Sequence, residues 1–294
     1  MKGFIMKGYR AKPYLFILPA MLVIVFTFFY PVIQLLIDSF QRISSAGRVF
    51  IGFENYASLL QDELFLTSLS HNIYLLISVP ILVFLSLIFA MFLFEQIPLW
   101  KFYRTVFYMP YMIAIPVVGI VFSYIFQLNG ILNQILRSIG LDVFALDWLG
   151  SSTYALNTLM FVIVWKEFGF GVVLFFARLM SVDEQLFEAA KLEGASWFQV
   201  FRKIVIPQLS IVIEFYVVVM IITMLSWVFN YVYVMTSGGP GNSTMVAEYY
   251  IYLTAFRYNQ MGKASAASII LLLVTMLLII ARSRLSKSIE VDVV

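Results

Sequence analysis

The chain has 294 residues, no cysteine, one histidine and a net charge of +3. Hydrophobic residues make up 62% of it and charged residues 12%, whereas soluble proteins carry about a quarter charged residues. This composition excludes a soluble domain, and the missing cysteines exclude disulfides and thiolate metal sites. The small net charge gives no indication of nucleic-acid binding, and neither a metal site nor a catalytic residue is expected.

Six apolar segments are each long enough to cross a bilayer core of about 30 Å as a helix. In chain order they are 14–37, 73–94, 105–126, 155–179, 205–230 and 264–281. The first is too long for the apolar region of a cleavable signal peptide and is expected to remain as a span. The sequence therefore predicts an all-α membrane protein with six transmembrane helices. It divides into a short tail, 1–13, and a single transmembrane domain, 14–294.

Lys and Arg residues decide the orientation of these spans. With the N-terminus inside, thirteen of them fall on the cytoplasmic side and five on the outer side. Both termini are therefore predicted to be cytoplasmic. The outer loops are then 38–72, 127–154 and 231–263, each of which is too short to form a domain.

A polar hairpin at 181–205 joins the fourth and fifth spans on the cytoplasmic side. Ser181 and Glu184 fit an S-x-x-E capping box that would open its first helix. Ser196 and Gln199 fit a second capping box, which would open a helix over 197–205. Gly194 lies between the two helices and supplies the permissive backbone that such a turn requires.

The first helix of this hairpin is suited to docking. Ala189 and Ala190 leave a low profile that fits a groove of a partner, and Glu188 with Lys191 offers charged contacts at the rim. An ordinary amphipathic connector is the alternative. The spacing to Gly194 and Ala195, and to Ile204 and Pro207 beyond them, favours docking.

With these residues in view, the chain resembles the membrane subunit of binding-protein-dependent sugar importers of the maltose and glycerol-phosphate permease type. The hairpin run from Glu188 to Pro207 carries most of the resemblance. Weaker matching stretches occur in the family's order at Gly52–Tyr56, Arg104–Pro110, Gly130–Asn133, Trp165–Phe170 and Gly238–Thr244. The chain departs from the pattern at Glu193, where Asp is commonest, at Ile206 in place of Leu, and at Ser210 in place of a second proline.

The resemblance implies the fold of a type I ABC importer permease in a bacterial or archaeal cytoplasmic membrane. It also implies partners: a second permease subunit, expected to be a distinct chain, two ATPase subunits and an extracytoplasmic solute-binding protein. The ATPase subunits would dock on Glu188, Ala189, Ala190, Glu193, Gly194 and Ala195. The binding protein would contact Gly238, Gly239 and Pro240.

The chain itself is not expected to hydrolyse ATP. No G-x-x-x-x-G-K-[ST] motif occurs, and Gly262-Lys263 lacks both the upstream glycine and the following hydroxyl residue. The chain is therefore expected to bind no cofactor, and ATP and Mg²⁺ would lie on the partner ATPase subunits.

Two adjacent charges, Lys166 and Glu167, lie in the fourth span, where an unpaired charge costs a few kcal/mol. Because neighbouring helical residues point about 100° apart, the two are not expected to pair face to face. They could line a translocation path or make a structural polar contact. Sugar recognition would use aromatic and amide groups, and the candidate path residues are Trp165, Lys166, Gly169, Trp227 and Asn230.

Two other classes were weighed against an importer of a sugar or polyol. An ion-coupled secondary transporter would use Lys166 and Glu167 as coupling charges, but inverted repeats and Gly- or Pro-broken spans are not apparent. A membrane enzyme would need a clustered nucleophile, metal ligands or paired carboxylates, and the sequence presents none. The solute itself is not specified by the sequence.

Overall fold

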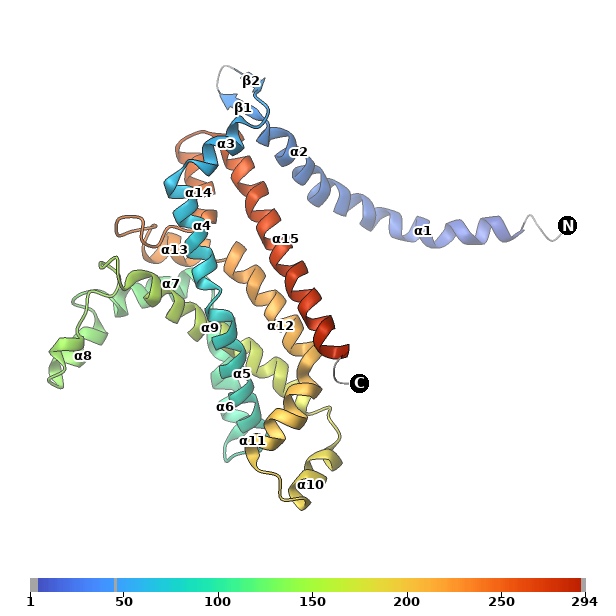
Figure 1. Cartoon of the computed structure of the whole chain (residues 1–294), viewed down its shortest axis with the longest axis vertical. Coiled ribbons are helices and arrows are strands. Elements are labelled where there is room, and N and C mark those ends of the chain that lie inside the picture. The colour runs from blue at the N-terminus through green and yellow to red at the C-terminus, as the bar shows by residue number, and fades with distance from the viewer. Residues whose placement is uncertain (1–4, 45–46, 292–294) are drawn as a thin grey trace. The chain divides into compact units, whose positions relative to one another are not determined.

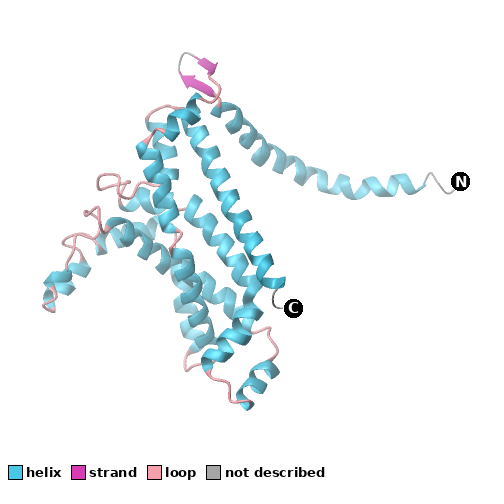
Figure 2. Ribbon diagram, in the orientation of Figure 1, coloured by secondary structure: helices cyan, strands magenta, loops and turns pink. Residues whose placement is uncertain are grey.

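The computed structural model describes residues 5–44 and 47–291 (Figure 1). Nearly all of its regular structure is helical, and one two-stranded hairpin is the exception within these residues (Figure 2). The backbone divides into two compact units. The first comprises the described residues up to Asp62 together with Ile251–Ile270, and the second comprises Glu63–Tyr250 with the described residues from Leu271 onward.

The first unit begins with a long helix. Helix α1 (Ile5–Ile24) continues through a π-helical turn, η1 (Val25–Phe29), into α2 (Tyr30–Ser39). An antiparallel hairpin follows, in which β1 (Gln41–Ser44) pairs with β2 (Gly47–Phe50), and then α3 (Glu54–Leu60). The unit also holds η4 (Leu253–Arg257) and the first turns of α15 (Met261–Val291).

Asn55 organises this unit. Its side-chain amide donates to the carbonyl oxygens of Ser39, at 2.8 Å, and Gln41, at 3.0 Å. At Gly262 a Cβ atom would overlap the Gln41 carbonyl, so α15 approaches this backbone closely. Lys263 adds an ion pair with Asp62 at 2.7 Å. The Gly52–Tyr56 stretch noticed in the sequence therefore contains the residue that ties the chain after the first span to α15.

The second unit is a helical bundle. Its elements are α4 (Glu63–Leu75), α5 (Ser78–Phe94), α6 (Trp100–Met112), α7 (Ile115–Ile125), α8 (Ile131–Ser138), η2 (Asp142–Phe144), α9 (Ala155–Leu179), α10 (Glu184–Leu192), α11 (Trp197–Val200), η3 (Phe201–Val205), α12 (Ile206–Ser226), α13 (Phe229–Met235) and α14 (Ala247–Tyr252). Helix α9 packs against α5, α6, α12 and α13 and forms the centre of this bundle. Small residues permit its close packing: a Cβ at Gly169 would overlap the Phe107 carbonyl of α6, and a Cβ at Gly171 would overlap Ser86 Oγ of α5.

Five described helical stretches are long and apolar enough to cross a membrane: Phe16–Ser39, Glu63–Phe94, Ala155–Leu179, Trp197–Ser226 and Met261–Arg282. A sixth crossing is formed by α6 and α7 if the pair counts as one span. The predicted spans 14–37, 73–94, 155–179 and 264–281 all fall on or within a few residues of these helices.

The third predicted span, 105–126, is not a continuous helix. Helices α6 and α7 meet at an angle of 97°. Ile113 and Ala114 between them are extended, with ψ of 136° at each, and Pro116 stands in the first turn of α7. In a continuous helix Pro116 could not donate to the Met112 carbonyl, and its ring would clash with that carbonyl, which explains a break between the two residues. The expectation that no span is broken was therefore wrong.

The fifth predicted span, 205–230, differs at both ends. Its helix begins at Trp197 and runs without interruption to Ser226. A π-helical turn at η3 precedes Pro207 and lets the helix pass the residue that lacks an N–H. At the other end the helix stops before Trp227, and Asn230 belongs to the separate short helix α13.

Candidate functional site

The first hairpin helix, α10, is capped by a residue that the sequence analysis passed over. Asp183 is the N-cap, and its carboxylate accepts a hydrogen bond from the Gln185 N–H at 3.0 Å. The predicted capping box of Ser181 and Glu184 is therefore wrong. Ser181 instead donates to the Arg178 carbonyl at the end of α9, at 2.7 Å. Asp is as good an N-cap as Ser, and here it lies directly before the helix.

The turn of the hairpin is a Schellman motif. Gly194 has φ of +74°, its N–H bonds to the Lys191 carbonyl at 3.1 Å, and the Ala195 N–H bonds to the Ala190 carbonyl at 2.9 Å. Only glycine adopts this backbone conformation without cost. The second helix then opens with the predicted capping box, in which Ser196 and Gln199 exchange hydrogen bonds at 2.7 and 3.4 Å.

The hairpin is attached to the end of α5. The Phe187 ring on α10 lies 4.8 Å from the ring of Phe94, and Phe187 is buried. Trp197 Nε1 donates to the carboxylate of Glu95 at 2.8 Å. In Figure 1 the hairpin accordingly lies where α5 ends and α6 begins. The contacts of the hairpin with Phe94 and Glu95 were not predicted, because nothing local in the sequence pairs residues so far apart in the chain.

The hairpin presents an exposed surface at its turn. Of the residues predicted to dock a partner, four are exposed, Glu188, Ala189, Glu193 and Gly194, and two are half-buried, Ala190 and Ala195. The structure adds Leu192, which is 90% exposed, and Phe198, which is 63% exposed. Large apolar side chains on a polar hairpin are a mark of a surface that a partner covers.

Lys166 and Glu167 form an ion pair. Both side chains are buried, and Lys166 Nζ lies 3.7 Å from Glu167 Oε1. Tyr231 of α13 donates to the same carboxylate oxygen at 3.1 Å. The expectation that the two adjacent residues would not pair was wrong, because the flexible lysine side chain spans the angular separation between them.

Lys166 also closes the break between α6 and α7. Its ammonium donates to the Tyr111 carbonyl at 3.1 Å and lies 5.0 Å from the centre of the Tyr111 ring. The helical partner of this carbonyl would be the N–H of Ile115, which already belongs to α7 beyond the break. Within a bilayer an unsatisfied carbonyl costs several kcal/mol. Lys166 therefore takes the place of the missing backbone donor.

The other predicted path residues do not gather at one point. Trp165 is half-buried with its ring edge-on to Phe122, and Gly169 is buried against α6. Trp227 is 56% exposed, just after α12, and Asn230 is half-buried on α13. Their role in solute recognition stays a prediction.

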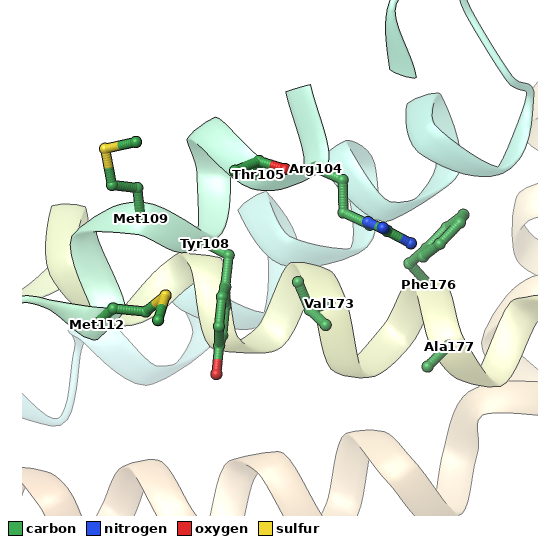
Figure 3. A pocket seen from close by; sticks show the side chains of 8 residues that line it. All are labelled: Arg104, Thr105, Tyr108, Met109, Met112, Val173, Phe176 and Ala177. Atoms are coloured by element: carbon green, nitrogen blue, oxygen red, sulfur yellow. The ribbon is translucent and has the colours of Figure 1, made fainter. Parts of the chain in front are cut away.

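A cleft of about 550 Å³ lies between α6 and α9. Figure 3 shows Arg104 and Phe176 at one end of it and Met112 at the other. Tyr108 and Val173 line the part between them. The cleft combines one guanidinium and one phenol with apolar side chains, which is the mixture that small-molecule sites use. Sequence analysis did not select Arg104 or Tyr108 as binding residues.

The outer loop predicted to contact a binding protein is held by internal contacts. Gly238 is buried with φ of +82°, and Pro240 is half-buried. Thr244 Oγ1 lies 2.7 Å from the Gly239 carbonyl and 2.8 Å from Thr236 Oγ1. The loop therefore has a defined shape, and its contact with a binding protein stays a prediction.

Asn72 forms hydrogen bonds to the start of α14, the helix that follows this loop. Its amide group donates to the Met224 carbonyl and to Glu248 Oε2, each at 2.9 Å, and accepts from the Ala247 N–H at 2.7 Å. The other carboxylate oxygen, Glu248 Oε1, is buried without a hydrogen-bond partner. Burial raises the pKa of Glu248 to about 7, although the hydrogen bond from Asn72 acts in the opposite direction.

We therefore expect Glu248→Gln to stabilise the protein at alkaline pH. Because the pKa of Glu248 in the folded protein, about 7, lies above the ordinary value of 4.5, the folded state loses stability as pH rises from 4.5 to 7. Above pH 7 the charged carboxylate costs about 3 kcal/mol, which the amide avoids. Thermal unfolding at pH 5 and pH 8 measures this: the variant should gain more at pH 8. An equal gain at both values would contradict it.

No group of three or more His, Asp or Glu side chains that could hold a metal ion occurs among the described residues. The prediction that the chain binds no metal or nucleotide of its own remains a prediction.

Known proteins are similar to this chain in sequence and in fold. A family described as "Binding-protein-dependent transport system inner membrane component" matches residues 67–291. The probable ABC transporter permease protein YurN of Bacillus subtilis is 35% identical, over 94% of this chain and 96% of that protein. The lactose transport system permease protein LacF of Rhizobium radiobacter is 30% identical, over 85% of each chain. The diacetylchitobiose uptake system permease protein NgcF of Streptomyces coelicolor is 34% identical, over 77% of this chain and 68% of that protein.

A solved bacterial ABC transporter involved in the import of the acidic polysaccharide alginate has the same fold. It superposes with a TM-score of 0.82 at 23% identity, covering 97% of this chain and 98% of that chain. The family match, the membrane helices and the cytoplasmic hairpin agree with one another. The chain is a membrane permease subunit of an ABC transporter and belongs to the family of binding-protein-dependent transport system inner membrane components.

Proposed function

We propose that this chain is the permease subunit of an importer that carries a sugar or related polyol across the cytoplasmic membrane. The observation that carries the proposal is the cytoplasmic hairpin, which is firmly attached through Phe187 and Trp197 yet presents Leu192 to its surroundings. Relatives named for lactose, diacetylchitobiose and arabinooligosaccharide transport support a carbohydrate as the solute.

The proposed importer has further subunits. Two ATPase subunits would bind ATP and Mg²⁺, and one of them would receive the hairpin formed by Glu188–Ala195. A second permease, a distinct chain, would complete the membrane part. A binding protein would deliver the solute at the outer loop that contains Gly238, Gly239 and Pro240. A related alginate transporter has been solved with its oligosaccharide-bound periplasmic protein, which supports the last of these partners.

The solute path would run along α9. The cleft between α6 and α9 offers Arg104 and Tyr108 as hydrogen-bonding groups, and the predicted path residue Gly169 packs against the backbone of Phe107 and Tyr108. Lys166 and Glu167 would act one layer behind this path by holding α6, α9 and α13 together. The ion-coupled alternative gains no support from the family or from this closed network.

The test is reconstitution. The chain would be co-purified with its neighbouring permease, ATPase and binding protein, and placed in liposomes with radiolabelled lactose, diacetylchitobiose or arabinotriose. We expect ATP-dependent uptake of at least one sugar and stimulation of ATP hydrolysis by the loaded binding protein. Uptake that continues without ATP, or an ATPase that does not associate, would overturn the proposal.

A further inference from the structure

Two hollows adjoin on the outer side of the second unit. One, of about 480 Å³, is lined by residues of α4, of the start of α9 and the loop before it, and of the loop before α14. They include Ser70, His71, Tyr74, Thr153, Asn157 and Ser243. The other, of about 320 Å³, contains four aromatic rings, those of Phe126, Trp148, Tyr154 and Phe161. Asn157 lines both, so the polar hollow and the aromatic hollow meet at its side chain.

The polar hollow presents groups with defined hydrogen-bonding roles. His71 Nδ1 lies 2.7 Å from the Met245 carbonyl, which can only accept, so this nitrogen carries the hydrogen. In the neutral ring, Nε2 is then an acceptor. Tyr74 donates to Asn157 Oδ1 at 2.7 Å, which fixes the amide and leaves its NH₂ group as a donor.

No Lys, Arg, Asp or Glu side chain lines either hollow in the described part of the chain. The lining instead combines uncharged hydroxyl, amide and imidazole groups with aromatic rings. Sites of this kind fix a ligand by a few polar groups and enclose its apolar surface with rings. A neutral sugar unit has both surfaces, because its hydroxyl groups donate and accept while one face of its ring presents C–H groups.

We propose that the two hollows form an outer carbohydrate subsite, in which a neutral sugar unit lies against the aromatic rings and directs hydroxyl groups to His71 and Asn157. This inference rests on the proposed function, since it presumes that the solute is a carbohydrate. It adds a contact for the solute on the outer side of this chain, apart from the path along α9. The competing interpretation is that the binding protein docks on the same surface.

The test measures sugar binding to the reconstituted importer in the absence of the binding protein. Radiolabelled lactose, diacetylchitobiose and arabinotriose are the probes, and the one that the complete importer takes up is the decisive one. We expect Asn157→Asp, which keeps the acceptor for Tyr74 and removes the donor, to raise its Kd about three- to tenfold, the effect of one hydrogen bond.

Stability separates a binding role from a structural one. Because Asn157→Asp keeps an oxygen acceptor for the Tyr74 hydroxyl, it should leave the unfolding temperature unchanged. Ser138→Ala is the control, because Ser138 is an exposed residue of α8 whose hydroxyl donates to the Ile135 carbonyl, away from both hollows. The Kd of this variant for the sugar should equal that of the unaltered importer.

Two results would overturn the subsite. One is an equal Kd for the imported probe in the variant and in the unaltered importer, or no detectable binding in either. The other is unchanged sugar binding with weakened docking of the sugar-free binding protein, which would make the surface a protein contact. Failure of the unaltered importer to take up any sugar is a different outcome, because it removes the proposed function itself.

Discussion

Leu192→Asp should reduce the ATP hydrolysis that loaded binding protein stimulates by more than tenfold, with the permease still folded. Leu192 is 90% exposed beside the turn of the hairpin, so the substitution disturbs no packing inside the chain. Burying a leucine in a partner stabilises the complex by about 1.5–3 kcal/mol, and a carboxylate in the same groove adds a desolvation penalty. The measurements are hydrolysis by the reconstituted complex and the amount of ATPase that co-purifies.

Leu99→Asp is the matched control for this prediction. Leu99 is also apolar and 70% exposed, and it lies in the other short cytoplasmic loop, between α5 and α6. Its φ of +66° is a conformation that Asp tolerates better than most residues. Stimulated hydrolysis should survive this change. Equal loss in both variants would point to a general effect of added charge, and normal activity in Leu192→Asp would remove the hairpin turn from the docking surface.

Lys166→Met should lower the free energy of unfolding by about 3–5 kcal/mol, the usual result of removing one partner from a buried ion pair. Two groups lose a partner at once. The Glu167 carboxylate loses its cation and keeps only the hydroxyl of Tyr231 among the contacts described above, and the Tyr111 carbonyl at the end of α6 loses its donor. Unfolding of the purified chain in mixed micelles, followed by tryptophan fluorescence, measures the loss.

The double variant Lys166→Met/Glu167→Gln divides that loss into its parts. It removes the uncompensated charge but leaves the Tyr111 carbonyl without its donor. We therefore expect it to recover part of the stability and to remain below the unaltered chain. Full recovery would mean that capping of Tyr111 contributes nothing. A Lys166→Met variant as stable as the unaltered chain would show that the pair does not hold α6 against α9.

The sequence predicted the hairpin well because its structure is local. Gly194 and the Ser196–Gln199 box act over three or four residues, and the chain offered no competitor for either role. Two residues that can cap the first helix, Ser181 and Asp183, lie close together in the sequence. Asp183 is the N-cap, so the S-x-x-E pattern placed the start of the helix two residues too early, at Ser181.

Long-range contacts were beyond such reasoning. Hydropathy identified the third span but not its break, although Pro116 marked the place. The partners of Lys166 and Glu167, Tyr111 and Tyr231, come from other helices, and no spacing in the chain brings them together. The exposure of Leu192 and the hollows around Asn157 likewise depend on how separate elements meet.

The hydrogen bond from Lys166 to the Tyr111 carbonyl, at the break in the third span, has a consequence for how the protein is made. Lys166 lies 55 residues after Tyr111. During synthesis α6 and α7 therefore enter the membrane with an open carbonyl, and only the arrival of α9 supplies its donor. We infer that α6 and α7 remain loosely inserted until the fourth span emerges from the ribosome. Glycosylation mapping of chains truncated before and after α9 would reveal this order, and firm insertion of the shorter chain would refute it.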